Sequence, residues 1–256
     1  MDDALRTLPI AALHDGEQFL VEKYGVGTLP SVGLTNLDYV GLEKSEVIAM
    51  GVSEFEDKAS LPGVALEIES IGRARAATTF LNENFTKAAL EQRKLTPYQI
   101  VHLATHAEFK EGTLSDSYIQ LWDEKLSLDE LAALGWDAPM VELLVLSACS
   151  TALGSSSAEL GFAGIAVASG VRSAIATLWP VDDLGTLALM SELYKRLGTH
   201  PTKATALQSA QLALLRDEID ISQADDLPAD LKQALRERTL AHPYYWSGFT
   251  LIGNPW

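Results

Sequence analysis

Short apolar runs alternate with helically spaced segments along most of the chain. The run at residues 143–146 (LLVL) is unbroken, which is typical of a strand buried on both faces of a parallel sheet. Six runs are predicted to be strands: residues 47–52, 77–81, 100–104, 143–146, 173–179 and 249–252. Helical spacing lies between them, at residues 64–71, 86–93, 129–134, 159–170, 185–197, 201–216 and 230–239. The pattern therefore predicts an α/β fold with a mostly parallel six-stranded sheet and helices on both faces.

Two shorter patterns predict hairpins. Asp15 and Gly16 form a turn signal between apolar runs at residues 5–13 and 19–24, which predicts an N-terminal pair of strands. Residues 117–128 alternate between apolar and polar side chains and predict a second, small hairpin. No repeat, low-complexity tract or linker interrupts the pattern, so we expect a single domain over residues 1–256. Because the first strand would begin within a few residues of Met1, we expect this domain to be a fragment of a longer chain.

The overall charge narrows the choice of partners. The 256 residues carry a formal charge of −16, which argues against binding to nucleic acid or to anionic membranes, because both require clustered Lys and Arg. A single cysteine excludes a disulfide framework and a thiolate-rich metal site, and it suits a reducing compartment. No segment has the length of a membrane span and the N-terminus lacks a signal-peptide core, so we expect a cytoplasmic location.

Candidate chemistry lies just past the carboxyl ends of three predicted strands, which are followed by His106, by Cys149, and by Asp182 with Asp183. Ligands of open α/β sheets bind in the crevice beyond these strand ends. If the first two strands are parallel neighbours, they lie about 4.8 Å apart, and the imidazole of His106 can reach the thiol of Cys149. The sequence thus predicts a Cys-His dyad in which His106 takes the thiol proton. Cys149 then attacks a carbonyl and forms a thioester that is hydrolysed.

The turns after these strands supply two further features. The backbone N–H groups of Ala107 and Cys149 would point into the same crevice and are the expected oxyanion donors. One of the acids Asp182 and Asp183 would hold a basic side chain next to the scissile bond.

Each candidate also has a structural interpretation. A lone cysteine such as Cys149 is often a buried thiol that acts as a small hydrophobic group. His102 is interpreted as a core histidine, and for His106 the core and catalytic roles are both open. Asp182 and Asp183 precede a predicted helix and would cap it.

Other chemistries have less support. There is no G-x-S-x-G elbow that would make Ser147 or Ser150 a nucleophile. No H-E-x-x-H or paired-cysteine pattern suggests a metal, and no P-loop or G-x-G-x-x-G fingerprint suggests a nucleotide. The proposed chemistry requires no cofactor. A flavodoxin-like small-molecule domain is a remaining alternative, and it predicts cofactor absorbance on purification.

Four motifs, HLATHAEF, LSACSTALG, ELGFAGIAVASGVRSAIATLWPVDD and HPYYWSGFTLIGNPW, resemble the CHAT domain. This is a caspase-like domain of bacteria, related to separase and often attached to TPR repeats. The resemblance implies a caspase–hemoglobinase-like three-layer sandwich, membership of that clan of cysteine peptidases, and a catalytic pair at His106 and Cys149. By similarity to the separase segment of LW-D-V-x-D type, the acid that holds a P1 arginine falls on Asp183, with Asp182 second. The implied preference is for Arg or Lys at P1.

The sequence departs from the clan at one important position. Members usually carry Gly directly after the catalytic His, whereas this chain has Ala107, which would strain the backbone or tilt the oxyanion donor if the position needs a positive φ. We expect a cysteine endopeptidase that acts on proteins or peptides and is regulated by a partner protein or by attached TPR repeats. The alternative, from a different class, is a catalytically silent CHAT-type scaffold that binds proteins and transmits a signal.

Overall fold

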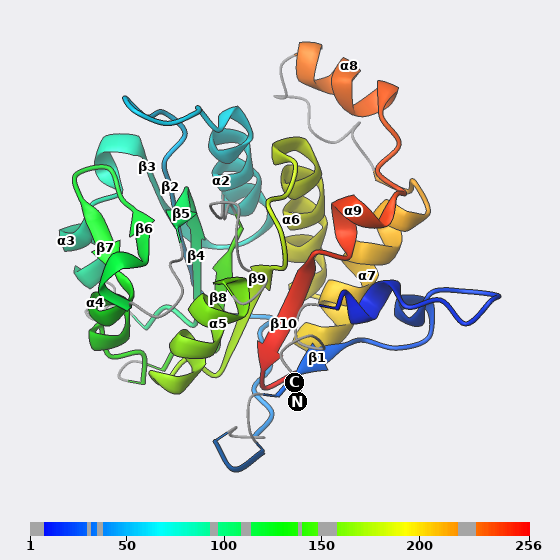
Figure 1. Ribbon diagram of the computed structural model, residues 1–256, viewed down its shortest axis with the longest axis horizontal. Helices are drawn as coiled ribbons and strands as arrows, with labels where there is room; N and C mark the ends of the chain where they lie inside the picture. The colour runs from blue at the N-terminus through cyan, green and yellow to red at the C-terminus, as the bar shows by residue number, and fades with distance from the viewer. Residues whose placement is uncertain are drawn as a thin grey trace.

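The fold is built around one central sheet (Figure 1). The computed structural model describes residues 8–29, 32–34, 38–92, 97–108, 114–137, 140–147, 158–219 and 229–256. The sheet has seven strands in the order β1-β10-β9-β8-β4-β2-β3. They span Gly27–Thr28 (β1), Val47–Gly51 (β2), Ala77–Leu81 (β3), Ile100–Ala104 (β4), Leu143–Leu146 (β8), Ser173–Thr177 (β9) and Phe249–Gly253 (β10). Neighbours are parallel except β9 and β10, which are antiparallel. The predicted six-stranded, mostly parallel sheet is confirmed, and the two-residue β1 extends it at one edge.

Helices cover both faces of the sheet. They span Pro62–Ala74 (α2), Lys87–Gln92 (α3), Leu128–Ala133 (α4), Ala158–Ala168 (α5), Asp183–Leu197 (α6), Lys203–Leu215 (α7), Ala229–Glu237 (α8) and Pro243–Trp246 (α9). One apolar core lies between the sheet and helices α2, α6, α7 and α9. A second core lies between the other face and helices α3, α4 and α5. The inner strands β2, β4, β8 and β9 are fully buried, and each contributes side chains to both cores, which explains their unbroken apolar runs.

A second, small sheet lies at the left of Figure 1, next to α3 and α4. Its strands are Ala107–Glu108 (β5), Tyr118–Gln120 (β6) and Lys125–Ser127 (β7), in that order. The antiparallel pair β6–β7 confirms the hairpin predicted at residues 117–128. Strand β5, which begins directly after His106, was not predicted.

The predicted N-terminal pair of strands is wrong. The turn at Asp15 and Gly16 does form, with Gly16 at φ +105° and one antiparallel bridge between His14 and Phe19. The flanking segments are 3-10 turns instead, at Ile10–Ala12 (η1) and Leu20–Glu22 (η2). An isolated hairpin gains little stability in water without a third strand or a packed face. Here the segment lies on α7, where the side chain of Gln208 donates a hydrogen bond to the carbonyl of Val21 at 2.8 Å.

In the part of the chain that the structure describes, further 3-10 turns connect the elements at Val32–Leu34 (η3), Asn82–Asn84 (η4) and Leu114–Asp116 (η6).

Candidate active site

Strands β4 and β8 place the two segments of the predicted dyad side by side. They are parallel neighbours, as predicted, and their register pairs His102 with Val145 and Leu103 with Leu146. Paired residues are therefore 43 positions apart in the sequence, the same separation as between His106 and Cys149. Cys149 lies in residues 148–157, outside the described residues, so its thiol and its backbone N–H stay predictions.

His106 lies two residues past the end of β4 and is held by a loop of the neighbouring strand β2. Its side chain is buried, with a relative exposure of 8%. Its Nε2 lies 2.8 Å from the carbonyl oxygen of Ala59, and its ring packs on that of Phe55 with centroids 4.5 Å apart. The loop that carries both residues is closed by a hydrogen bond from Leu61 N–H to the carbonyl of Ser53. The sequence analysis did not identify this loop as part of the site. The one signal for it is that it directly follows the predicted strand at residues 47–52.

The Ala59 contact fixes the chemistry of the imidazole. A carbonyl oxygen is an acceptor, so Nε2 must carry a hydrogen, and in the neutral ring Nδ1 is left as the acceptor. Burial lowers the pKa of His106 below its ordinary 6.5, with a contribution from Lys58, against the Ala59 bond and Asp57, which raise it. At neutral pH the ring is therefore neutral and has a basic nitrogen at Nδ1.

The backbone N–H of Ala107 is not used by the small sheet, and its conformation is unstrained. It pairs with Ile119 in the small sheet, and the ladder bond beside it runs from Gln120 N–H to the carbonyl of His106 at 2.8 Å. In such a pair the N–H of Ala107 points away from β6. Among the described residues, the non-glycine positions with positive φ are Asn82 and Asp217. Ala107 therefore does not need the backbone conformation that would make alanine unfavourable there.

A cavity of about 420 Å³ opens beside the His106 loop. It is lined by Val52, Glu54, Phe55, Glu56, Asp57, Gln120, Leu121 and Trp122. Phe55 contacts both this cavity and the ring of His106. A substrate segment that approaches His106 from this side would meet acidic and aromatic side chains.

Asp183 begins α6 and reaches across to the N-terminus of α2. Its Oδ2 accepts a hydrogen bond from the backbone N–H of Gly63 at 2.7 Å. Burial raises the pKa of Asp183 above its ordinary value, and the negative charges of Glu67 and Asp182 add to this, whereas the Gly63 bond lowers it. Asp183 is thus a half-buried carboxylate surrounded by like charge.

Asp182 behaves differently from its neighbour. It is the N-cap of α6, where its Oδ1 accepts a hydrogen bond from Gly185 N–H at 3.0 Å. Its other oxygen pairs with the exposed Arg238 at 3.2 Å. The capping interpretation is therefore confirmed for Asp182, while Asp183 binds the N-terminus of a different helix. Sequence reasoning did not identify Gly63, because nothing in the sequence links it to a residue 120 positions away.

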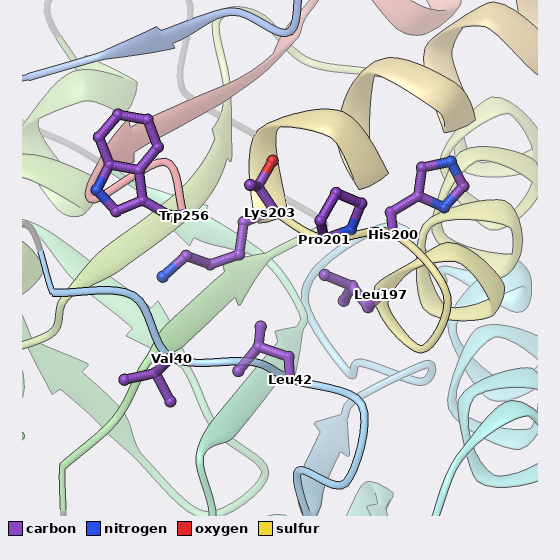
Figure 2. Close-up of a pocket in the computed structure, with 8 residues that line it drawn as sticks. Val40, Leu42, Leu197, His200, Pro201, Lys203 and Trp256 are labelled. Atoms are coloured by element: carbon purple, nitrogen blue, oxygen red, sulfur yellow. The ribbon is translucent and has the colours of Figure 1, made fainter.

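A second, much narrower pocket lies around the start of α7, near the amino end of β8 (Figure 2). The centre of a water molecule can occupy only about 10 Å³ of it, which is room for about one water. Lys203 lines it next to Trp256 and Val40, and its Nζ donates one long hydrogen bond of 3.4 Å to the carbonyl of Glu142. Burial lowers the pKa of Lys203 to about 8, and the charge of Arg172 contributes. Glu142 precedes β8, so this pocket is separated from His106 by the length of the sheet.

The described residues also bear on membrane and metal functions. None of their helices combines the length and apolar character that crossing a bilayer requires. No group of three or more His, Cys, Asp or Glu side chains among them is arranged to hold a metal ion.

Comparison with solved structures finds similar folds among cysteine peptidases. The chain is similar to the Arg-specific cysteine proteinase gingipain R (RGPB), with 10% identity and a TM-score of 0.47 over 84% of this chain and 48% of that chain. It therefore spans about half the length of that protein. It is also similar to caspase-1 from Spodoptera frugiperda, with 16% identity and a TM-score of 0.43 over 71% of this chain and 82% of that one. A complex of Porphyromonas gingivalis RgpB pro- and mature domains matches with 11% identity and a TM-score of 0.43, over 99% of this chain and 52% of that one.

Sequence comparison gives the family. No curated protein matches the chain significantly. A family model of the CHAT domain matches residues 1–254. The match covers nearly the whole sequence and confirms the resemblance of the four motifs, so this chain belongs to the CHAT-domain family.

Proposed function

We propose that this chain is a cysteine endopeptidase that uses His106 and Cys149 and cleaves proteins or peptides after Arg or Lys. The observation that carries the proposal is the register of β4 and β8. Strand partners are 43 residues apart, so a continuation of the register would bring Cys149 opposite His106. Neighbouring strands lie about 4.8 Å apart, which is within reach of an imidazole and a thiol.

The tautomer of His106 supports its role as the base. With Nε2–H donated to Ala59, Nδ1 accepts the thiol proton as Cys149 Sγ attacks the carbonyl carbon of the scissile bond. The tetrahedral intermediate collapses when the C–N bond breaks, and His106 returns the proton to the leaving amine. A water molecule then gives a proton to His106 and attacks the thioester, and the acid product leaves as the thiol is restored.

The backbone at Ala107 supports stabilisation of the oxyanion. Its N–H points away from the small sheet, because the ladder bond is made by the residue before it. A donor fixed by a short hairpin costs little reorganisation when the negative charge develops. The N–H of Cys149 is proposed as the second donor.

The environment of Asp183 supports a basic P1 side chain. The charges that act on this carboxylate are those of Glu67 and Asp182, both negative, and its hydrogen-bond donor is a neutral amide. A half-buried carboxylate in this setting gains most from a cationic ligand. Asp182 is the weaker choice because Arg238 already pairs with it.

The cellular setting is part of the same proposal. The single cysteine suits a reducing, cytoplasmic compartment. Control by a partner protein or by attached TPR repeats follows from the family resemblance. The formal net charge of −16 disfavours nucleic acid and anionic membranes as partners.

The test is a fluorogenic peptide library with every residue represented at P1, assayed with the wild type and with Cys149→Ala. Cleavage after Arg or Lys in the wild type alone is expected. Cleavage that persists in Cys149→Ala would refute the mechanism. If no peptide is cleaved and iodoacetamide does not label the cysteine rapidly, the catalytically silent scaffold becomes the better description.

A further inference from the structure

Four buried polar side chains form a network within the strands and helices that lead to the candidate site. They are His102 on β4, Glu67 on α2, Tyr194 on α6 and Ser147 at the end of β8, each with a relative exposure of 0–1%. Nε2 of His102 lies 3.0 Å from Glu67 Oε1 and 3.2 Å from Ser147 Oγ, while its Nδ1 lies 3.1 Å from Tyr194 OH. His102 is therefore the one member of the network that contacts the other three.

The network is not a second catalytic centre, although it contains a serine, a histidine and an acid. In a nucleophilic triad the serine and the acid bind opposite nitrogens of the imidazole. Here Ser147 and Glu67 share Nε2, which carries at most one hydrogen. Complete burial of all four side chains also leaves no path for a substrate.

Stability alone does not explain the network. Taking a carboxylate and an imidazole out of water is costly, and buried ionic groups can often be replaced by apolar ones of similar volume without loss of stability. A buried polar network can instead define one arrangement of the surrounding elements.

The positions of the four residues along the chain indicate which arrangement is defined. His102 is four residues before His106, and Ser147 is two residues before Cys149. Glu67 lies one turn after Gly63 on α2, and the N–H of Gly63 binds Asp183. Tyr194 lies on α6, the helix that Asp183 begins. Each segment that contributes to the proposed site is thus connected to His102 by one side chain.

We propose that His102 is a positioning residue. Through its contacts with Ser147, Glu67 and Tyr194 it holds the ends of β4 and β8 and helices α2 and α6 in the arrangement in which the catalytic pair faces Asp183. This inference rests on the proposed function, because it assigns His102 a role in that same site. Ser147 matters most for the pair. The ladder bond from Ser147 N–H to the carbonyl of Leu103 is long, at 3.2 Å, and the Oγ contact with His102 gives this strand end a second attachment.

The experiment measures the pH dependence of iodoacetamide labelling of Cys149, which is the single cysteine of the chain. The variants are Ser147→Ala and Tyr194→Phe, which each remove one hydroxyl contact with His102. The matched control is Ser70→Ala. Ser70 Oγ donates to Ser191 Oγ at 2.9 Å and so also joins α2 to α6, but it takes no part in the network.

In the wild type we expect the labelling rate to inflect clearly below about 8.5, the pKa of a free cysteine, because neutral His106 accepts the thiol proton as the sulfur reacts and the rate then follows the titration of His106. In Ser147→Ala and Tyr194→Phe the inflection is expected to move toward the free value, and the labelling rate at pH 7 to fall about tenfold. Ser70→Ala should keep the wild-type inflection. A partly unfolded variant would also label with the free-thiol inflection, so only variants that circular dichroism shows to be folded are compared, and Ser70→Ala reports the effect of losing a merely structural contact between the same helices.

The result that overturns the inference is a wild-type inflection in both network variants while their circular dichroism shows a folded protein. Two variants are used so that one remains informative if the other fails to fold. In a further outcome, the wild type has a low inflection that shifts in the variants and yet cleaves no peptide. This outcome refutes the proposed peptidase but supports the positioning role. A wild-type inflection near 8.5 refutes both.

Discussion

Replacing Gly63 with alanine tests how Asp183 is held. A Cβ atom at Gly63 would lie 2.7–2.8 Å from the carboxyl carbon and both oxygens of Asp183. Atoms of this size do not approach so closely, so the carboxylate must move and lose its 2.7 Å hydrogen bond to Gly63 N–H. The substitution therefore acts on Asp183 without changing its chemistry.

The magnitude follows from two opposing contributions to the free energy of unfolding. A hydrogen bond to a charged group contributes roughly 1.5–3 kcal/mol. Alanine in place of glycine in a helix returns about 0.5–1 kcal/mol. We expect Gly63→Ala to lower the free energy of unfolding by about 1–2 kcal/mol, or the melting temperature by about 2–8 °C for a chain of this size.

Gly72 provides a matched control in the same helix. A Cβ there would meet Thr79 Cγ2 at 3.5 Å, an ordinary contact, so Gly72→Ala should keep or slightly raise stability. Urea unfolding followed by circular dichroism compares the two variants with the wild type. In the double variant Gly63→Ala, Asp183→Ala the clash is gone, so it should be no less stable than Asp183→Ala alone. If Gly63→Ala is as stable as Gly72→Ala, the described contact between Gly63 and Asp183 does not exist in solution.

Three further predictions concern pH and charge. Asp183→Asn should reduce kcat/KM for Arg and Lys peptides by roughly 30-fold or more. In the wild type the preference for Arg or Lys at P1 should weaken as the pH falls through the pKa of Asp183, which lies above the ordinary 3.8. If the P1 profile of Asp183→Asn equals that of the wild type, another residue binds the basic side chain. The acid limb of the kcat/KM profile should lie below pH 6.5, because burial lowers the pKa of His106, and an inflection above 6.5 would contradict the neutral tautomer. Lys203 has a pKa of about 8 in the folded protein against 10.5 ordinarily. The unfolded chain therefore binds more protons between these values, and stability should rise with pH across that range by up to about 3 kcal/mol. The Lys203→Met variant should lack this slope in urea unfolding at several pH values, and an equal slope in both proteins would locate the titration elsewhere.

The sheet could be predicted from the sequence because its strands have a strong local signal. The run at Leu143–Leu146 is apolar on both faces, and the structure places it between β4 and β9 with both faces buried. The prediction of paired N-terminal strands was wrong because only the turn between them has a strong local signal. Asp15 and Gly16 determine a turn, but whether the flanking residues become strands depends on what they pack against, and they pack against α7.

The sequence predicted the residues of the candidate site that directly follow strands, but it did not predict their contacts. His106, Asp182 and Asp183 are recognised because each follows a strand, and their neighbours cannot be read in the same way. The partner of His106 is the main-chain carbonyl of Ala59, which has no side-chain signature. Glu67 appears in the sequence as one more acid on an amphipathic helix, although its relative exposure is 1% in the structure.

The bond between His106 and the carbonyl of Ala59 determines which changes this segment tolerates. A main-chain acceptor is present whatever side chain the residue carries, so substitutions at position 59 leave the imidazole tautomer unchanged. An inserted or deleted residue is different, because the loop is closed between Ser53 and Leu61 and its length sets where that carbonyl lies. Natural variation in the loop beside His106 should therefore be free in residue type and strict in loop length.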